Sequence, residues 1–267
     1  MRIPFTKTHG AGNDFLLTWL NEAPRENLTE AAKGICNRRT GIGADGWILI
    51  SQPPPGETGY DGAIQLFNSD GSPAELSGNG TRCAAAFLVD VGMAWDTVRI
   101  QTGAGVKNLK LLERSGLSFV LEMNMGKPQF PEGDAVTLNL LSGPRPVIIV
   151  DVGNPQCVVE VADFDFDWRG VGAEIERHPH FPKRTNVSFI RTVDAHTLEV
   201  RFYERGAGET LSSGTGSTGA AAAALHLGRV SSPVTVLTPA GPLQLRSEGG
   251  VYLVGPAQII GGGEFYL

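Results

Sequence analysis

Two serines stand directly before short Gly-X-Gly loops, and these loops are the places where this sequence could do chemistry. Ser77 begins the string SGNGTRCAAAFLVDVG and Ser213 begins SGTGSTGAAAAALHLG, so each loop leads into an alanine-rich segment that favours a helix. Serine is a good N-cap residue, and the first amides of a helix have no partners inside it. Such a helix start attracts anions. The pattern predicts two capped helix starts, each of which is either a carboxylate site or only a structural cap.

The two loops belong to an internal repeat. The second loop follows the first by 136 positions, and the same shift lays residues 64–68 (IQLFN) over residues 200–204 (VRFYE). Both runs alternate apolar and polar residues, as half-buried strands do. A looser pairing sets Asn13 and its preceding glycine against Asn154 and its own. The repeat therefore predicts two similar halves, each with a strand, a glycine loop and a short helix.

The elements around the loops are mostly short strands. Only three or four helices are expected, one of them over residues 28–36. We therefore expect a sheet-rich α/β (α+β) fold with two domains related by a pseudo-twofold axis and a ligand cleft between them. Strand-like runs occur at residues 47–50, 98–102, 118–123, 186–190 and 234–238.

The composition favours small-molecule chemistry. The chain has 267 residues, a formal net charge of -6 and no run of Lys or Arg longer than two, which argues against nucleic-acid or membrane partners. Its three cysteines, an odd number at long spacings, fit reduced thiols and a cytoplasmic location. The histidines lack metal-binding spacing. GTGSTG at residues 214–219 matches a dinucleotide fingerprint, but no acidic residue follows about 20 positions on and no parallel βαβ unit is expected around it.

Seven short strings along the chain form a specific set. They are HGAGNDF (9–15), TGIGADG (40–46), FNSDGS (67–72), SGNGTRC (77–83), VGNP (152–155), TNV (185–187) and YERGAGET (203–210). In these motifs the chain resembles the diaminopimelate epimerase family, and the similarity runs nearly from end to end. The resemblance implies an epimerase of lysine and peptidoglycan biosynthesis that interconverts LL- and meso-diaminopimelate without cofactor or metal, and a homodimer. It also implies that each half is a curved mixed sheet around a central helix.

Carried over residue by residue, the resemblance also implies a site. Residues 1–120 with 256–267 would form the N-terminal half and residues 121–255 the C-terminal half. The loop amides would stabilise the charge that grows on the substrate carboxylate when its α-carbon loses a proton, and Arg205 would clamp a second carboxylate. The implied substrate-binding residues are Asn13, Asn68, Gly78, Asn79, Asn154, Asn186, Glu204, Arg205, Gly214 and Thr215.

The chain departs from the family at its two acid–base residues. The family has a cysteine before each loop, where this chain has Ser77 and Ser213, and the family's histidine after VGNP is Gln156. An unassisted hydroxyl is a poor base, so Glu204 is the candidate partner of Ser213, and Gln156 is a candidate to orient Ser77. The predicted catalytic residues are therefore Ser77, Ser213, Glu204 and Gln156.

Three interpretations stay open at this stage. The serines could work as a hydroxyl acid–base pair in a diaminopimelate epimerase. The chain could instead be an impaired or substrate-trapping homologue that binds without epimerising. It could also be a racemase or isomerase of another substrate on the same fold, because Gly46 stands where the family usually has glutamine and would enlarge the site.

Overall fold

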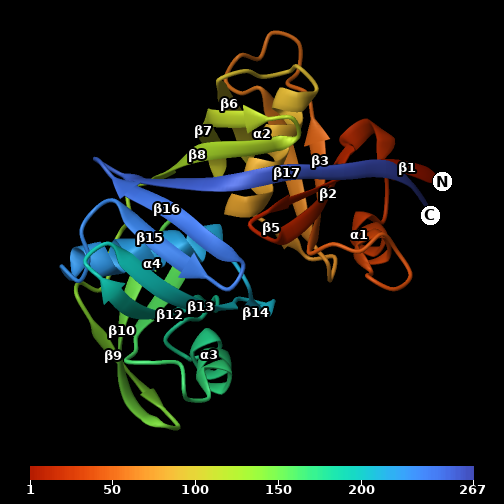
Figure 1. The fold of residues 1–267 in the computed structure, drawn as a ribbon. Coiled ribbons are helices and arrows are strands. Elements are labelled where there is room, and N and C mark those ends of the chain that lie inside the picture. Colours follow the sequence, from red (N-terminus) through yellow and green to blue (C-terminus); the bar gives the residue numbers. More distant parts are fainter. The chain divides into compact units, whose positions relative to one another are not determined.

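The computed structural model describes residues 1–267, which form two compact units. Unit 1 comprises Met1–Met123 and Gly255–Leu267, and unit 2 comprises Asn124–Val254. Strand β8 (Ser118–Gly126) and strand β17 (Val251–Tyr266) each run from one unit into the other. Figure 1 shows β17 as the long blue strand near the C-terminus.

Unit 1 places two helices among its strands. The connection from β2 to α1 contains one short 3-10 helix, Leu20–Glu22. The elements are β1 (Arg2–Gly10), β2 (Asn13–Trp19), α1 (Leu28–Cys36), β3 (Gly46–Ser51), β4 (Gly62–Asn68), β5 (Pro73–Ala74), α2 (Gly78–Asp90), β6 (Thr97–Thr102) and β7 (Gly105–Ser115).

Unit 2 repeats this order of elements after one additional strand. That strand, β9, pairs with the strand that follows it. The elements are β9 (Val136–Leu140), β10 (Gly143–Asp151), β11 (Pro155–Glu160), α3 (Trp168–Glu176), β12 (Asn186–Asp194), β13 (Thr197–Glu204), β14 (Gly208–Thr210), α4 (Gly214–His226), β15 (Val234–Thr238) and β16 (Gly241–Ser247).

The strand pairings repeat as well. In unit 1, β1–β2, β3–β4, β4–β5 and β6–β7 are antiparallel, whereas β2–β3 and β4–β6 are parallel. In unit 2, β10–β11, β12–β13, β13–β14 and β15–β16 are antiparallel, whereas β11–β12 and β13–β15 are parallel. The expected fold, two sheet-rich domains with mixed sheets and few helices, is confirmed. The expectation that no βαβ unit surrounds GTGSTG is wrong, because β13 and β15 are parallel neighbours on either side of α4. The short alternating runs of these two strands indicate burial but do not predict whether the strands pair parallel or antiparallel.

Helices α2 and α4 are the central helices of their units. Residues 78–89 of α2 are all buried, and so are residues 214–224 of α4. Helix α2 packs against β1, β2, β3, β4 and β6, and α4 packs against β10, β11, β12, β13, β15 and β16. Alanine and glycine residues suit a central helix because the surrounding strands can approach them closely. At 13 residues each, these longest helices fall short of what a membrane crossing needs.

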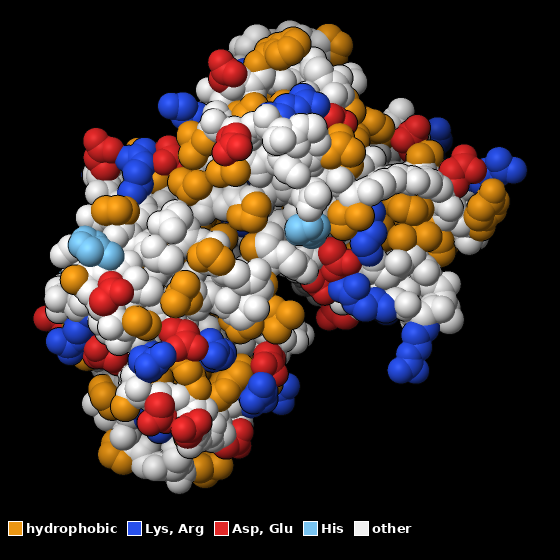
Figure 2. All heavy atoms as spheres, viewed as in Figure 1, with side chains coloured by type: hydrophobic (Ala, Val, Ile, Leu, Met, Phe, Trp, Pro, Cys, Tyr) orange, Lys and Arg blue, Asp and Glu red, His pale blue; other side chains and the backbone are white.

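Helices α1 and α3 cover the outside of the sheets through equivalent apolar clusters. In unit 1, Ala31, Ala32 and Ile35 of α1 pack with Trp47 and Leu49 of β3. In unit 2, Trp168 and Ile175 of α3 pack with Phe189 of β12, and the Trp168 and Phe189 rings meet edge to face. On the face drawn in Figure 2, acidic and basic side chains are interspersed, so neither sign of charge forms a patch there.

The second glycine of each loop is required by packing. A Cβ at Gly80 would lie 3.3 Å from the Phe15 ring, and a Cβ at Gly216 would lie 2.8 Å from the Phe202 ring. Phe202 is 1% exposed, so its ring has no room to move. The Gly-X-Gly pattern therefore lets a buried helix begin against an aromatic core.

We predict opposite effects for one substitution at two helical glycines. Gly216→Ala should destabilise the fold by about 1–3 kcal/mol, because the added methyl overpacks the Phe202 ring. Gly34→Ala in α1 is the matched control, because its Cβ would have its nearest neighbour at 3.8 Å. It should stabilise the fold by about 0.5–1 kcal/mol through helix propensity. Urea unfolding measures both, and equal effects at the two positions would contradict the packing argument.

Candidate functional site

The Ser213 hydroxyl lies between the start of α4 and a carboxylate. Its Oγ accepts a hydrogen bond from the Gly216 amide at 3.0 Å and donates one to Glu204 Oε1 at 2.5 Å. Ser213 is 4% exposed, so this charge-assisted bond is largely shielded from water. The Ser213 hydroxyl proton therefore already points to an acceptor, as predicted for this pair.

Ser77 has the same cap without the carboxylate. Its Oγ accepts the Gly80 amide hydrogen bond at 3.1 Å. At the end of β4, Asn68 occupies the repeat position of Glu204, and its side chain donates to Ser72 Oγ at 2.9 Å. Unit 1 therefore offers Ser77 no proton acceptor equivalent to Glu204.

Each cap leaves the first two helix amides available to a ligand. Ser77 O accepts the Thr81 amide at 2.8 Å, and Ser213 O accepts the Ser217 amide at 2.9 Å. Because the serine hydroxyl takes the third amide and the serine carbonyl takes the fourth, the first two make no hydrogen bond within the chain. These first two amides belong to Gly78 and Asn79 in α2 and to Gly214 and Thr215 in α4.

A chain of amide side chains supports the start of α4. Gln156 Nε2 donates to Asn154 Oδ1 at 2.7 Å, and Asn154 Nδ2 donates to Thr215 Oγ1 at 3.3 Å. Gln156 is fully buried, and a Cβ at Gly219 would lie 2.9 Å from its Cγ, so the glycine makes room for it. Its Oε1 has no hydrogen-bond partner. Within unit 2, Gln156 therefore acts on the loop through Asn154, and its predicted effect on Ser77 stays a prediction.

A matching chain supports the start of α2, and its buried end is an arginine that sequence reasoning missed. Asn79 Nδ2 donates to Asn13 Oδ1 at 3.2 Å, and Arg82 Nη2 donates to Asn79 Oδ1. Arg82 is fully buried, burial lowers its pKa to about 10, and its Nη1 has no partner. A charged residue one turn into an alanine-rich helix was the available signal. The guanidinium adds a positive charge behind the loop amides.

Asn13 connects this chain to a group of charged residues at the surface. Its Nδ2 donates to Asp45 Oδ2 at 2.7 Å. Arg38 makes ion pairs with Asp14 and Asp45, and Lys7 makes one with Asp14. Burial opposes ionisation of Asp14, but the hydrogen bonds from Arg38 and Lys7 outweigh it and hold its pKa at about 2. The ion pairs of Asp14 and Asp45 with Arg38 hold the start of β2, which carries Asn13.

Asn186 and Arg205 meet at the end of β13. Asn186 Oδ1 accepts the Arg205 backbone amide at 3.0 Å, and its Nδ2 donates to the Pro155 carbonyl at 3.0 Å. The exposed Arg205 guanidinium donates to the Lys183 carbonyl at 3.4 Å and makes no ion pair. It therefore has donors left for a ligand carboxylate.

The structure removes one reason for expecting a different substrate. A Cβ at Gly46 would lie 2.8 Å from the Phe67 carbonyl oxygen and 3.1 Å from the Phe15 ring. The idea that Gly46 enlarges the site is therefore wrong, because neighbouring groups of unit 1 already fill the space.

None of the three cysteines presents an accessible thiol. Cys36, Cys83 and Cys157 are free and buried. Burial raises the pKa of Cys83 to about 11 and that of Cys36 to about 12, and it also raises the pKa of Cys157. Cys83 is 0% exposed, in the core of unit 1. No cluster of three or more His, Cys, Asp or Glu side chains is arranged to hold a metal.

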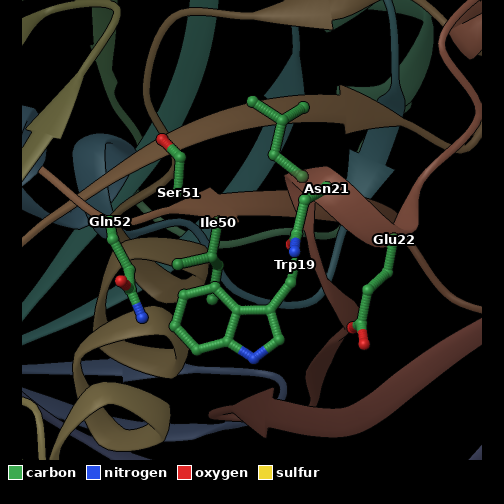
Figure 3. Close-up of a pocket in the computed structure, with 7 residues that line it drawn as sticks. Trp19, Asn21, Glu22, Ile50, Ser51 and Gln52 are labelled. Atoms are coloured by element: carbon green, nitrogen blue, oxygen red, sulfur yellow. The ribbon is translucent and has the colours of Figure 1, made fainter. Parts of the chain in front are cut away.

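A separate pocket of about 620 Å³ lies in unit 1 beyond the ends of β2 and β3. Its floor is the Trp19 indole beside Ile50, with Glu22 and Gln52 at its edge (Figure 3). None of the predicted site residues lines it.

Comparisons with known proteins agree with the motifs. The family model described as diaminopimelate epimerase matches residues 5–131 and 148–260. The chain is 37% identical to the diaminopimelate epimerase of Pelotomaculum thermopropionicum over 98% of each chain. It is 38% identical to that of Synechococcus elongatus over 100% of this chain and 99% of the relative. The solved structure of a hydroxyproline epimerase from Agrobacterium vitis matches with a TM-score of 0.75 and 16% sequence identity. The match covers 98% of this chain and 90% of that epimerase, and it shows a shared fold.

We predict that Asp14 makes the stability of the protein depend on acid pH. Its pKa is depressed from 3.8 to about 2, so it stabilises the fold above pH 4 and the contribution disappears as the pH falls toward 2. Asp14→Asn should therefore cost about 1–2 kcal/mol at pH 6, less than the full shift because Arg38 is 57% exposed. The difference from wild type should shrink toward pH 2.5 in urea unfolding. Asp165→Asn, which removes an exposed carboxylate, should show no such change.

Proposed function

This chain belongs to the diaminopimelate epimerase family and is an amino-acid epimerase of that type, and from this premise we propose how its own residues perform the reaction. The proposed reaction is the interconversion of LL- and meso-diaminopimelate by removal and return of the α-proton. Ser77 and Ser213 are the proposed acid–base groups, one from each predicted half. The observation that carries the proposal is the hydrogen bond from Ser213 Oγ to Glu204 Oε1 at 2.5 Å.

Glu204 solves the chemical problem that a serine base creates. A free alkoxide is far more basic than a thiolate, so a serine that simply lost its proton would be too costly a base. With Glu204 in place, Ser213 Oγ accepts the α-proton of the substrate while its own proton passes to Glu204 Oε1. The Cα–H bond breaks, its electron pair moves into the substrate carboxylate, and the negative charge leaves Glu204. Reversal of the same transfers regenerates the original stereoisomer, whereas inversion requires the proton to return on the opposite face of the α-carbon.

The loop amides stabilise the charge that this step creates. The amides of Gly78, Asn79, Gly214 and Thr215 are fixed before the reaction by the caps behind them, so they need no reorganisation when the carboxylate gains charge. Arg82 adds a buried cation behind Asn79. These fixed dipoles favour the deprotonated substrate over the bound substrate, which is the difference that accelerates the reaction.

Ser77 is proposed to return a proton on its own face of the α-carbon. Its oxygen is occupied only as an acceptor from Gly80, so its hydroxyl hydrogen is available to the carbanion. Because unit 1 provides no carboxylate there, a water molecule protonates Ser77 Oγ as the serine gives its own proton to the carbanion. The hydroxide that forms is neutralised through solvent by the proton that Glu204 took up, so Glu204 regains its charge. Proton return at Ser77 therefore draws on solvent, whereas proton removal at Ser213 draws on Glu204.

The remaining contacts select the substrate. Arg205 is proposed to bind the distal carboxylate, and the asparagines are proposed to hold the amino and carboxylate groups. We also propose that the enzyme serves lysine and peptidoglycan biosynthesis in the cytoplasm as a homodimer, as the family resemblance implies.

We predict that the unmodified protein exchanges the α-proton of LL-diaminopimelate in deuterium oxide. Proton NMR should show loss of the α-proton signal and growth of the meso form. A Ser77→Cys/Ser213→Cys variant is the comparison. Silence of the unmodified protein together with activity of this variant would overturn the hydroxyl mechanism, and silence of both would overturn the proposed substrate.

We predict that the carboxylate of Glu204 is essential to the exchange. Glu204→Gln should slow exchange by on the order of 100-fold or more, because the Ser213 proton then has no basic acceptor. Glu209→Gln is the control for loss of a negative charge. Glu209 lies on β14, next to β13, and its exposed carboxylate pairs with Arg169, so this variant should leave exchange unchanged. Equal exchange rates in the two variants would contradict the role of Glu204.

A further inference from the structure

Glu176 is a buried carboxylate that no step of the proposed reaction uses. It is the last residue of α3, and its side chain is 1% exposed. A carboxylate at the C-terminal end of a helix faces the negative end of the helix dipole, so it does not stabilise its own helix. Burial of an anion also requires close partners. The reason for this residue must therefore lie in the groups that it contacts.

Three donors from two loops surround the Glu176 carboxylate. Its Oε1 accepts the Gly206 backbone amide at 3.1 Å and the Arg184 guanidinium, and its Oε2 accepts Arg177 Nε at 3.3 Å. Its backbone carbonyl also accepts the Thr185 amide at 3.3 Å. Glu176 therefore joins the loop before β12 to the turn after β13. Figure 1 shows α3 beside these strands.

The turn held by Glu176 is the one that carries Arg205. Asn186 holds the Arg205 amide, and Glu176 holds the next amide, that of Gly206. Gly206 has a φ of 78°, and the turn closes by a bond from the Ala207 amide to the Glu204 carbonyl at 3.1 Å. Two successive amides are thus anchored from outside the turn, which fixes the direction in which the Arg205 side chain leaves it.

Arg184 links the same carboxylate to Asn186. Its φ is 62°, the left-handed region that residues other than glycine avoid. The ion pair with Glu176 stabilises this conformation, and Asn186 follows two residues later. Glu176 therefore holds the Gly206 amide directly. Through Arg184 it also supports Asn186, which holds the Arg205 amide.

We propose that Glu176 is a positioning residue for Arg205 and sets the selectivity of the protein for amino acids with a second carboxylate. The inference rests on the proposed function in one respect, that Arg205 binds the distal carboxylate. Glu176 touches no substrate. Its carboxylate holds the turn so that the Arg205 guanidinium is presented to an anion before one arrives, which reduces the ordering needed on binding.

The test compares two ligands that differ only by the distal carboxylate. L-Lysine is diaminopimelate without one carboxylate. The affinity for diaminopimelate divided by the affinity for L-lysine, called the ratio below, therefore isolates the Arg205 contact. Isothermal titration calorimetry with an equilibrated mixture of the diaminopimelate stereoisomers, and separately with L-lysine, gives this ratio without requiring turnover. Glu176→Gln keeps the size of the side chain but turns an amide toward the Arg184 and Arg177 donors. Arg205→Gln removes the guanidinium and shows the ratio that remains when the contact with the distal carboxylate is lost completely.

We expect Glu176→Gln to lower the ratio on the order of tenfold, to leave L-lysine binding nearly unchanged, and to raise the KM for diaminopimelate far more than it changes kcat. Glu176→Asp should recover part of the ratio. Glu209→Gln should leave it at the wild-type value. If Glu176→Gln does not fold, Arg184→Lys tests the same link at a more exposed position and should lower the ratio in the same direction.

The outcomes separate this inference from the proposed function. If the wild-type protein prefers diaminopimelate and the Glu176→Gln variant keeps the full ratio, the proposed role of Glu176 is wrong while the proposed substrate stands. Equal weakening of both ligands also overturns it, because that result indicates a general structural role. A wild-type protein that does not prefer diaminopimelate to L-lysine overturns the proposed substrate and this inference together.

Discussion

The rest of the structure depends on how two buried helices begin. A helix inside a protein must satisfy its first amides, since an unpaired buried N–H is costly. Ser77 and Ser213 satisfy the third and fourth amides with one hydroxyl and one carbonyl each. The glycines at positions 80 and 216 let the aromatic core approach the same turn. The first two amides are left to an outside acceptor. The packing of the helix and the availability of its first two amides to a ligand therefore have a single cause.

The repeat gives both units this helix start, but the charges around it differ. Unit 2 has Glu204 where unit 1 has Asn68, and unit 1 has the buried Arg82 where unit 2 has Thr218. A carboxylate beside one serine favours proton removal there, while a cation behind the other loop favours negative charge on whatever its amides bind. The two units are thus alike in backbone and unlike in chemistry. In the proposed mechanism the two serines have different tasks, so they do not need identical surroundings.

The sequence allowed the elements and the loops to be predicted because their signals are local. Serine before Gly-X-Gly and an alanine run indicates a capped helix start without reference to the rest of the chain, and the repeat identified both copies. Strand direction could not be predicted, and β13 and β15 proved parallel, because alternation reports burial and not the neighbour of a strand. Arg82, Glu176 and the packing against Gly46 were missed for a similar reason. Each depends on partners far away in the chain, such as the Pro256 carbonyl for Arg82 and the Gly206 amide for Glu176. The pairing of Ser213 with Glu204 was predicted because a serine base needs a carboxylate partner and the family resemblance places Glu204 in the site. The structure shows their hydrogen bond, and the catalytic role of Glu204 stays a prediction.

A serine where the family resemblance implies a cysteine leaves the helix start intact and, in the proposed mechanism, changes which atom carries the basicity. Oxygen suits the cap: the contacts of Ser213 at 3.0 Å and 2.5 Å are lengths that hydroxyl groups form, and serine is a favoured N-cap where cysteine is not. A thiol would have supplied its own acidity at this position. A hydroxyl does not, so the proton must continue to a group that can hold it, and the only carboxylate bonded to Ser213 is Glu204. With serine at residue 213 the helix start keeps its free amides, and in the proposed mechanism Glu204, at the end of β13, accepts the proton.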